Sequence, residues 1–291
     1  NIGSSSHRVA GAAGETYAAA NLPSLVLADG PAGLRLSTRY RRAEDGGEIA
    51  LDDPLAGMRL TGQPGEDGED VLYRYMTAIP VGASLAQSWN RALCEGMGSL
   101  VGREMTLFGV DIWLAPALNI QRDPLCGRNF EYLSEDPLLS GCLAAAIVRG
   151  VQKIKGRSAT VKHFLCNNQE TDRTFSSSNL SERALRELCL KGFEICIRES
   201  HPDCVMSSYN LVNGVHTAES RAFLTDVLRN EWGFEGLVMT DWLSTGGMGT
   251  GEKYGPATPR GCIAAGNDLI MPGRREDFED VMAALNEGAL P

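Results

Sequence analysis

Short apolar runs alternate with longer amphipathic stretches along almost the whole chain. The short runs are rich in valine, isoleucine and leucine and are bounded by glycine, proline or acidic residues, which is typical of buried strands. The predicted strands lie at residues 24–28, 78–81, 110–115, 159–165, 204–208, 236–240 and 268–271. The chain is therefore expected to contain seven strands.

The longer stretches carry apolar residues at helical spacing. The predicted helices lie at residues 85–108, 137–154, 181–199, 222–232 and 277–286. Gly109 and Gly233 follow two of them directly, where a glycine commonly ends a helix. No two predicted strands are joined by a two-residue turn, so the pattern favours βαβ units and a parallel sheet in an α/β fold.

Polar residues follow the apolar runs at several strand ends. Asp29 ends one run, Lys162 and His163 lie in another, and Tyr209 and Asp241 follow two more. In a (β/α)8 barrel the carboxyl ends of all strands meet on one face, whereas a doubly wound sheet forms sites only at a switch point. The spread over several strands therefore favours a TIM-like barrel, formed by residues 1–291 as a single domain.

Two glycine-rich segments interrupt this pattern. Residues 39–69 are also acidic, and we expect them to form a long insertion or lid, with a disordered insert as the alternative. Residues 244–255 lack the GxxxxGK[ST] pattern of a phosphate-binding loop, so we expect a flexible active-site loop there.

Composition and charge exclude several classes of protein. The 291 residues are 43% hydrophobic, enough for a sizeable core, and the net charge of −10 without a basic cluster argues against nucleic acid as a partner. No apolar run approaches the roughly 20 residues that cross a bilayer, so no membrane partner is expected.

The cysteines and histidines indicate a compartment and argue against a metal. The eight cysteines form no CxxC pair and no dense framework, which favours free buried thiols in a reducing cytoplasm. His201 and His216 have no metal-ligand spacing, so neither a metal nor a cofactor is expected.

The strand-end residues have a chemistry in common. A carboxylate that attacks an anomeric carbon must be ionised, and neighbouring cations favour that state. Asp241 with Lys162, His163 and Arg128 would satisfy this requirement, and Trp242 offers an apolar face for a sugar ring.

Each residue also has a purely structural interpretation. Asp241 could cap a helix, and Asp29 could organise the turn that follows it. Glu131 is expected to form a structural ion pair, and Arg128 could be its partner. His163 and Trp242 could be ordinary core residues.

Several longer motifs resemble glycoside hydrolase family 3, in its β-glucosidase branch. They run through most of the chain in a fixed order: LADGPAGLR, GRNFEYLSEDP, VKHFLCNNQE, SERALRELCLKGFE, MSSYNLVNG, FLTDVLRNEWGFEGLVMTDW and AGNDLIMPG. Each motif is weak by itself, and together they are specific. Barrels of this family are often irregular or incomplete, which fits the seven predicted strands.

The resemblance implies roles for individual residues. Asp241 would be the nucleophile of a retaining mechanism, and Tyr209, Trp242 and Met206 would line the first sugar subsite. The residues expected to hydrogen-bond the sugar hydroxyls are Asp29, Arg128, Lys162 and His163. The expected substrate is a β-linked glucoside or oligosaccharide, because Trp242 stands where a cysteine would suggest a xylosidase.

The resemblance also implies a missing partner. In β-glucosidases of this family the acid/base glutamate comes from a separate α/β sandwich domain, for which this chain is too short. We therefore expect the chain to be a segment of a longer multidomain enzyme.

Four alternatives remain open. The chain could be a stand-alone glycosidase that uses Glu170, although Glu170 is expected to pair with Arg173. It could be a β-N-acetylhexosaminidase, although the KHF motif here continues as LCNN and not as PGHG. It could be a non-catalytic sugar-binding module, or an unrelated Schiff-base enzyme that uses Lys162.

Overall fold

The computed structural model describes residues 2–3, 5–18, 21–52, 70–246, 251 and 253–290. Its strands are β1 (Ile2–Gly3), β2 (Gly14–Thr16), β3 (Val26–Ala28), β4 (Arg39–Arg42), β5 (Glu48–Ala50), β6 (Leu72–Tyr73), β7 (Ile112–Trp113), β8 (Ser158–Phe164), β9 (Ser177–Ser178), β10 (Cys204–Ser207), β11 (Leu211–Val212), β12 (Val215–His216) and β13 (Leu237–Met239). Its α-helices are α1 (Gly82–Gln87), α2 (Arg91–Phe108), α3 (Pro137–Gln152), α4 (Glu182–Ala184), α5 (Lys191–Ser200), α6 (Pro259–Ala265) and α7 (Arg275–Asn286). Two π-helical segments, η1 (Leu185–Cys189) and η3 (Ala222–Glu231), and one 3-10 turn, η2 (Thr217–Glu219), complete the set.

The central sheet is an incomplete parallel barrel. Its strand order is β1-β2-β3-β7-β8-β10-β13, in which β3 through β13 are parallel and the two strands at the other edge are antiparallel. Beyond β13, Leu269 adds one parallel bridge to Met239. The expectation of an irregular TIM-like barrel is therefore confirmed.

Two of the seven predicted strands differ from the structure. Residues 78–81 form no strand, because the backbone N–H of Ile79 bonds the carbonyl of Ala32 in a turn and not a neighbouring strand. Residues 268–271 follow β13 but make only the bridge at Leu269. There the Asp268 carboxylate accepts a hydrogen bond from the Val238 N–H, so this N–H is not available for a backbone hydrogen bond between strands.

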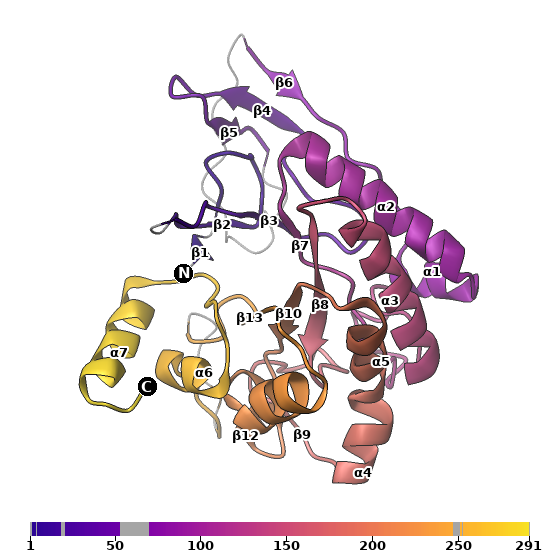
Figure 1. The fold of residues 1–291 in the computed structure, drawn as a ribbon, viewed down its shortest axis with the longest axis vertical. Helices are drawn as coiled ribbons and strands as arrows, with labels where there is room; N and C mark the ends of the chain where they lie inside the picture. The colour runs from indigo at the N-terminus through magenta and orange to yellow at the C-terminus, as the bar shows by residue number, and fades with distance from the viewer. Residues whose placement is uncertain are drawn as a thin grey trace.

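Helices α2, α3 and α5 cover one face of the sheet (Figure 1). The predicted helix 85–108 is in fact two helices, because Trp89 adopts φ 52° and the Asn90 side chain accepts the Leu93 N–H to start α2. The predicted helix 181–199 is interrupted by the π-segment η1. The short helix α6 was not predicted.

The strands separate two apolar layers. Side chains on the outer face, with those of the covering helices, form the larger core, whose buried members include Val26, Val161, Val205, Val238 and Phe193. The alternate residues point into the barrel and form a smaller cluster: Leu27, Ile112, Leu114, Met206, Met239 and Met271. The two-residue period of a strand thus divides each run between the two layers.

Part of the predicted insertion is an ordered antiparallel sheet, in the order β5-β4-β6. Arg74 fastens it: its guanidinium lies 4.1 Å from the Tyr40 ring centroid, pairs with Glu48 and donates to the Ser37 carbonyl. Residues 53–69 of the predicted insertion lie outside the described residues.

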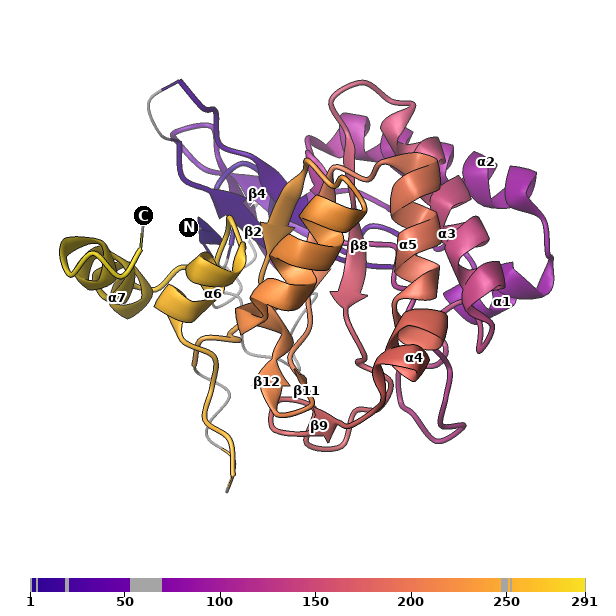
Figure 2. The same cartoon turned by 60° about the horizontal axis from the view of Figure 1, so that its bottom comes forward.

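Three further short strands, β9, β11 and β12, lie in the direction in which the β8 arrow points (Figure 2). They therefore lie beyond the carboxyl end of β8. All eight cysteines are free, and seven are buried. No helix among the described residues has the length and apolar character to cross a membrane.

Candidate active site

The inward faces of β3 and β13 continue into an aspartate at the carboxyl end of each strand. Asp29 follows Leu27 by two positions, and Asp241 follows Met239 by two, so both carboxylates continue the inward side of the pleat. The local sequence thereby places charged groups at the mouth of the barrel and keeps apolar groups below them.

These residues meet in a cavity of about 480 Å³. Its lining includes all eight residues predicted for the site: Asp29, Arg128, Lys162, His163, Met206, Tyr209, Asp241 and Trp242. The cavity is lined further by side chains not predicted to contact substrate, among them Arg35, Leu114, Phe130, Glu131, Glu170 and Arg173.

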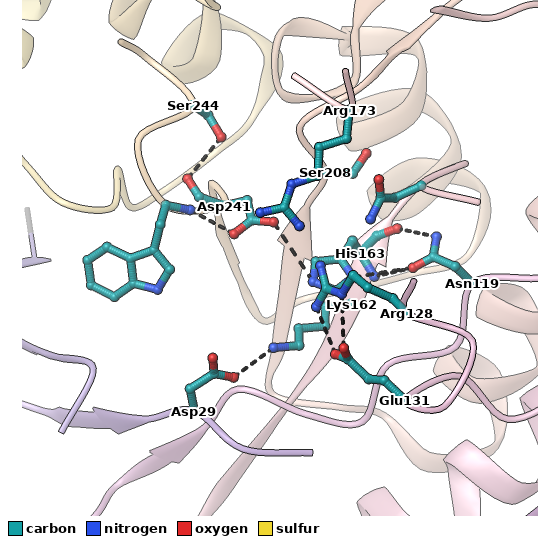
Figure 3. Close-up of polar contacts among 12 residues, drawn as sticks. Asp29, Asn119, Arg128, Glu131, Lys162, His163, Arg173, Ser208, Asp241 and Ser244 are labelled. Atoms are coloured by element: carbon teal, nitrogen blue, oxygen red, sulfur yellow. Dashed lines mark hydrogen bonds and ion pairs between the residues drawn. The ribbon is translucent and has the colours of Figure 1, made fainter. Parts of the chain in front are cut away.

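Asp241 presents one free carboxylate oxygen to this cavity. The residue is 5% exposed, and its Oδ1 accepts the N–H of Trp242 at 2.8 Å. Its Oδ2 is buried and has no hydrogen-bond partner in the described part of the chain, with His163 Nε2 the facing atom at 3.8 Å (Figure 3). No helix starts at Asp241, so the interpretation as a helix cap is excluded.

The charge on Asp241 is opposed by burial and favoured by three cations. Burial raises the pKa of this carboxyl above its ordinary value, while Arg128, Lys162 and Arg173 partly offset the rise. The carboxylate therefore lies in a poorly solvated but positively charged surrounding. Its negative charge is thus less stabilised than it would be in water.

Asp29 and Lys162 form an ion pair across the barrel mouth. Lys162 Nζ donates to Asp29 Oδ1 at 2.9 Å, and Arg35 pairs with the other oxygen. Burial would raise the pKa of Asp29, but Lys162 and Arg35 together hold it well below its ordinary value. Asp29 thus does more than organise a turn, since its side chain stays ionised beside the cavity.

Arg128 and Glu131 form a two-pronged ion pair. Arg128 Nε and Nη2 donate to the two Glu131 oxygens at 2.9 and 2.8 Å. Burial would lower the pKa of Arg128, but Glu131 raises it above its ordinary value. The predicted ion pair is therefore present, and it holds the guanidinium at the edge of the cavity.

His163 is buried and neutral. It is 1% exposed, and burial together with Arg128 and Lys162 lowers the pKa of its imidazole well below the ordinary value. Its backbone N–H donates to Asn119 Oδ1 at 2.8 Å, and its carbonyl accepts from Asn119 Nδ2 at 2.8 Å. Because these contacts fix its backbone, the ring is held at the cavity wall.

Arg173 is one of the charged lining residues that the sequence analysis did not place in the site. It pairs with Glu170 at 2.6 Å, as expected, but its guanidinium also lies 4.6 Å from the Tyr209 ring centroid. Burial and the nearby Asp241 raise the pKa of Tyr209 well above its ordinary value, so its hydroxyl keeps its proton.

The remaining walls are apolar. Met206 lies at the base with Leu114, and Trp242 is half-buried beside Asp241. Phe130 is 55% exposed at the rim. Polar groups on one side and apolar faces on the other suit a ligand that has both hydroxyl groups and a hydrocarbon face.

Metal binding has no support in the described ranges, where no three His, Cys, Asp or Glu side chains converge. The predicted active-site loop 244–255 lies partly outside the described residues. Of its described part, the Thr245 carbonyl accepts a hydrogen bond from Arg274.

Comparison with known proteins supplies a family. The family model described as "Glycosyl hydrolase family 3 N terminal domain" matches residues 59–291. Beta-glucosidase A from Butyrivibrio fibrisolvens is 48% identical over 219 residues, which is 75% of this chain and 24% of that protein. An exo-alpha-(1->6)-L-arabinopyranosidase from Bifidobacterium longum is 39% identical over 269 residues, which is 92% of this chain and 31% of that protein.

Solved structures agree. Beta-glucosidase 3B from Thermotoga neapolitana in complex with glucose superposes with a TM-score of 0.81 at 46% identity, covering 98% of this chain and 36% of that one. The chain thus spans about a quarter to a third of the length of the curated relatives named above.

Proposed function

Because this chain belongs to the N-terminal domain family of glycosyl hydrolase family 3, we propose that it is the barrel domain of a retaining β-glycosidase. It carries the nucleophile and the first sugar subsite for a β-glucoside. The observation that carries the proposal is the buried, unpartnered Oδ2 of Asp241, which faces a cavity lined by cations.

The first chemical step follows from that geometry. Asp241 Oδ2 attacks the anomeric carbon, the bond to the leaving oxygen breaks, and that oxygen takes a proton from an acid. Water then attacks the anomeric carbon from the opposite side and gives a proton to the conjugate base of that acid, while the bond from this carbon to Asp241 Oδ2 breaks and releases the carboxylate. The three cations near Asp241 favour its ionised form and partly offset the effect of burial.

Sugar binding uses the charged rim. The Asp29 carboxylate accepts hydrogen bonds from sugar hydroxyl groups. Lys162 and Arg128 donate charge-assisted hydrogen bonds to hydroxyl oxygens. His163 adds a ring nitrogen at the same wall. Trp242 and Met206 contact the apolar faces of the ring.

The acid is expected from a companion domain. A retaining enzyme needs a second carboxyl group about 5–5.5 Å from the first. The two glutamates in the cavity lining are both engaged: Glu131 accepts from Arg128 with both oxygens, and Glu170 accepts from Arg173 and Asn167. We therefore place the acid in a separate domain, consistent with relatives about three times as long as this chain.

The geometry disfavours the Schiff-base alternative. A Schiff base requires a free amine, whereas the buried ammonium of Lys162 donates to the Asp29 carboxylate. The identity of the pyranose that binds must be settled by experiment. The reason is that a relative covering 92% of this chain is an arabinopyranosidase and not a glucosidase.

The test is covalent labelling. Incubation with a 2-deoxy-2-fluoro-β-glucoside that has a very good leaving group should add one fluoroglucosyl unit, detected by intact mass and located on Asp241 by peptide mapping. A 2-deoxy-2-fluoro-α-L-arabinopyranoside, run in parallel, compares the two pyranoses.

Two variants sharpen this test. Asp241→Asn should remain unlabelled, whereas Glu170→Gln should label as the parent does, since Glu170 is not the nucleophile. An adduct on another residue, or labelling of Asp241→Asn, would refute the assignment.

A further inference from the structure

Asn119 contacts His163 from behind the cavity wall. Asn119 is 2% exposed, does not line the cavity, and lies six residues after β7. It meets His163 at three atoms: the backbone N–H at 2.8 Å, the backbone carbonyl at 2.8 Å and ring Nδ1 at 3.3 Å. This arrangement clamps both the backbone and the ring of one residue with a single amide.

The two backbone contacts determine which end of the amide faces the ring. A backbone N–H can only donate, so the Asn119 atom that meets it must be the oxygen. A carbonyl can only accept, so the other amide atom must be the nitrogen. The amide orientation is therefore fixed independently of the ring, and Asn119 Oδ1 is the atom facing His163 Nδ1.

That orientation selects a tautomer. Oδ1 is an acceptor, so Nδ1 must carry the proton for this contact to be a hydrogen bond. The neutral ring has one N–H, and Nε2 is then left with a lone pair. Nε2 is the ring atom that faces Asp241 Oδ2, at 3.8 Å (Figure 3).

We propose that Asn119 is a positioning residue that keeps His163 in the Nδ1–H tautomer and thereby leaves the Asp241 carboxylate without a donor from that ring. The opposite tautomer would direct an N–H at Oδ2 and convert the 3.8 Å approach into a hydrogen bond. That bond would satisfy Asp241 Oδ2, which is buried and has no hydrogen-bond partner among the described residues.

The consequence for catalysis rests on the proposed function. In the Nδ1–H tautomer, Nε2 accepts a hydrogen bond from a substrate hydroxyl, while Oδ2 stays free to attack the anomeric carbon. In the other tautomer, His163 would hold the nucleophile in a charge-assisted hydrogen bond that must break before attack. Asn119 thus acts on the reaction through His163 and touches no substrate.

The surrounding charges keep the His163 ring neutral, so its tautomer determines which ring nitrogen carries the proton. Arg128, Lys162 and Arg173 face the imidazole and disfavour imidazolium, while the ring edge approaches Tyr132 at a centroid distance of 6.2 Å. Asp241 is the carboxylate facing the ring. With the ring neutral, the position of its single proton decides what it presents to Asp241.

Nitrogen NMR tests the tautomer directly. The chain has four histidines, so a long-range ¹H–¹⁵N correlation spectrum of the protein with labelled histidine resolves four rings, and His163→Gln identifies the signal of interest. The proposal expects a protonated Nδ1 and an unprotonated Nε2 for His163 at neutral pH. A protonated Nε2, or an imidazolium, would overturn it.

Variants connect the tautomer to reactivity. Asn119→Ala should move the His163 proton to Nε2 and slow the maximal rate of fluoroglucoside labelling by about tenfold or more, the equivalent of one charge-assisted hydrogen bond. The fluoroglucoside concentration giving half-maximal rate should rise as well, because a protonated Nε2 no longer accepts a hydrogen bond from a substrate hydroxyl.

The matched control is Asn267→Ala. Asn267 is a buried amide that donates to the Ala218 and Cys262 carbonyls and does not line the cavity. It should leave both the His163 spectrum and the labelling rate unchanged. An unaltered rate in Asn119→Ala after a tautomer change would overturn the link to reactivity. If the NMR spectrum shows the Nδ1–H ring but the wild-type protein is not labelled, the proposed function is contradicted and the tautomer assignment stands.

Discussion

As the proposed nucleophile, Asp241 would serve the reaction at a cost to the stability of the folded protein. Burial opposes its charge, and Arg128, Lys162 and Arg173 offset only part of that effect. A carboxylate in a well-solvated surrounding would be more stable and less reactive. The raised pKa of Asp241 therefore has a consequence for stability that does not depend on any substrate.

Asp241→Asn should increase the free energy of unfolding near neutral pH. Between the ordinary pKa of 3.8 and the raised folded pKa, the folded protein binds more protons than the unfolded chain, so the contribution of Asp241 to stability falls as pH rises through that window. The asparagine has no such loss. Urea unfolding at several pH values should show a gain at neutral pH that shrinks as pH falls; lower stability at neutral pH would contradict this.

Asp29 has the opposite balance. Asp29→Asn would leave the buried ammonium of Lys162 without its carboxylate, and loss of one partner of a buried pair costs roughly 3 kcal/mol. Lys162 is 3% exposed, so water cannot replace the lost partner. Urea unfolding at neutral pH measures the effect.

The pH dependence of this pair has a definite sign. Because the folded pKa of Asp29 lies below 3.8, its contribution is present above that pH and is lost as the pH falls through the folded value. Asp45→Asn is the control, because Asp45 pairs with His7 in an exposed position and its loss should change little. Equal effects from both variants would show that the Asp29 pair is not a buried one.

At the scale of elements, glycines bring α2 and α3 into close contact. A Cβ at Gly150 would lie 2.1 Å from the Glu95 carbonyl oxygen, and one at Gly98 would lie 2.2 Å from that of Ile147. The helices therefore pack backbone against backbone. This contact supports the layer that covers the sheet behind β8.

Gly150→Ala should destabilise the protein although alanine favours helices. Alanine gains about 0.5–1 kcal/mol in a helix interior, whereas forcing a methyl group into this contact costs about 1–3 kcal/mol. Gly96→Ala is the matched control, since a Cβ at this exposed position of α2 meets nothing within 4 Å and should give the gain alone. Urea unfolding of both should show changes of opposite sign; a gain in both would mean that the helices separate at little cost.

Sequence patterns predict some elements better than others for physical reasons. The runs ending at Asp29 and Asp241 form buried parallel strands, so their composition and their polar ends were informative. Residues 78–81 have a similar composition, but their backbone hydrogen-bonds to a turn and not to a strand. The local sequence does not determine which carbonyl a backbone N–H will donate to.

The site divides in the same way. Strand-end residues could be predicted because topology brings strand ends together. Asn119 and Arg173 lie outside strands, and their contacts with His163 and Tyr209 depend on how loops fold over the barrel mouth. Spacing along the chain does not encode such contacts.

At the scale of the molecule, the proposed site has a nucleophile, but the other carboxyl groups of its described lining are all held in ion pairs. The chain spans about a quarter to a third of its curated relatives, and the glutamates that line the cavity are engaged by arginines. If the two catalytic groups lie in different domains, the barrel alone can form the glycosyl ester only when the leaving group needs no proton. Substrates with different leaving groups therefore test this division.

Cleavage by this chain alone should therefore depend strongly on the leaving group. A dinitrophenolate departs without a proton, so Asp241 should be glycosylated by dinitrophenyl β-glucoside, whereas a β-linked disaccharide should react about 10²–10⁴-fold more slowly than with a complete enzyme that supplies the acid. Azide attacks without a base, so adding it should speed turnover of the aryl glucoside and yield β-glucosyl azide, which chromatography and NMR detect. Comparable rates on the aryl glucoside and the disaccharide would place the acid within this chain, and Glu170→Gln would then be the variant that removes it.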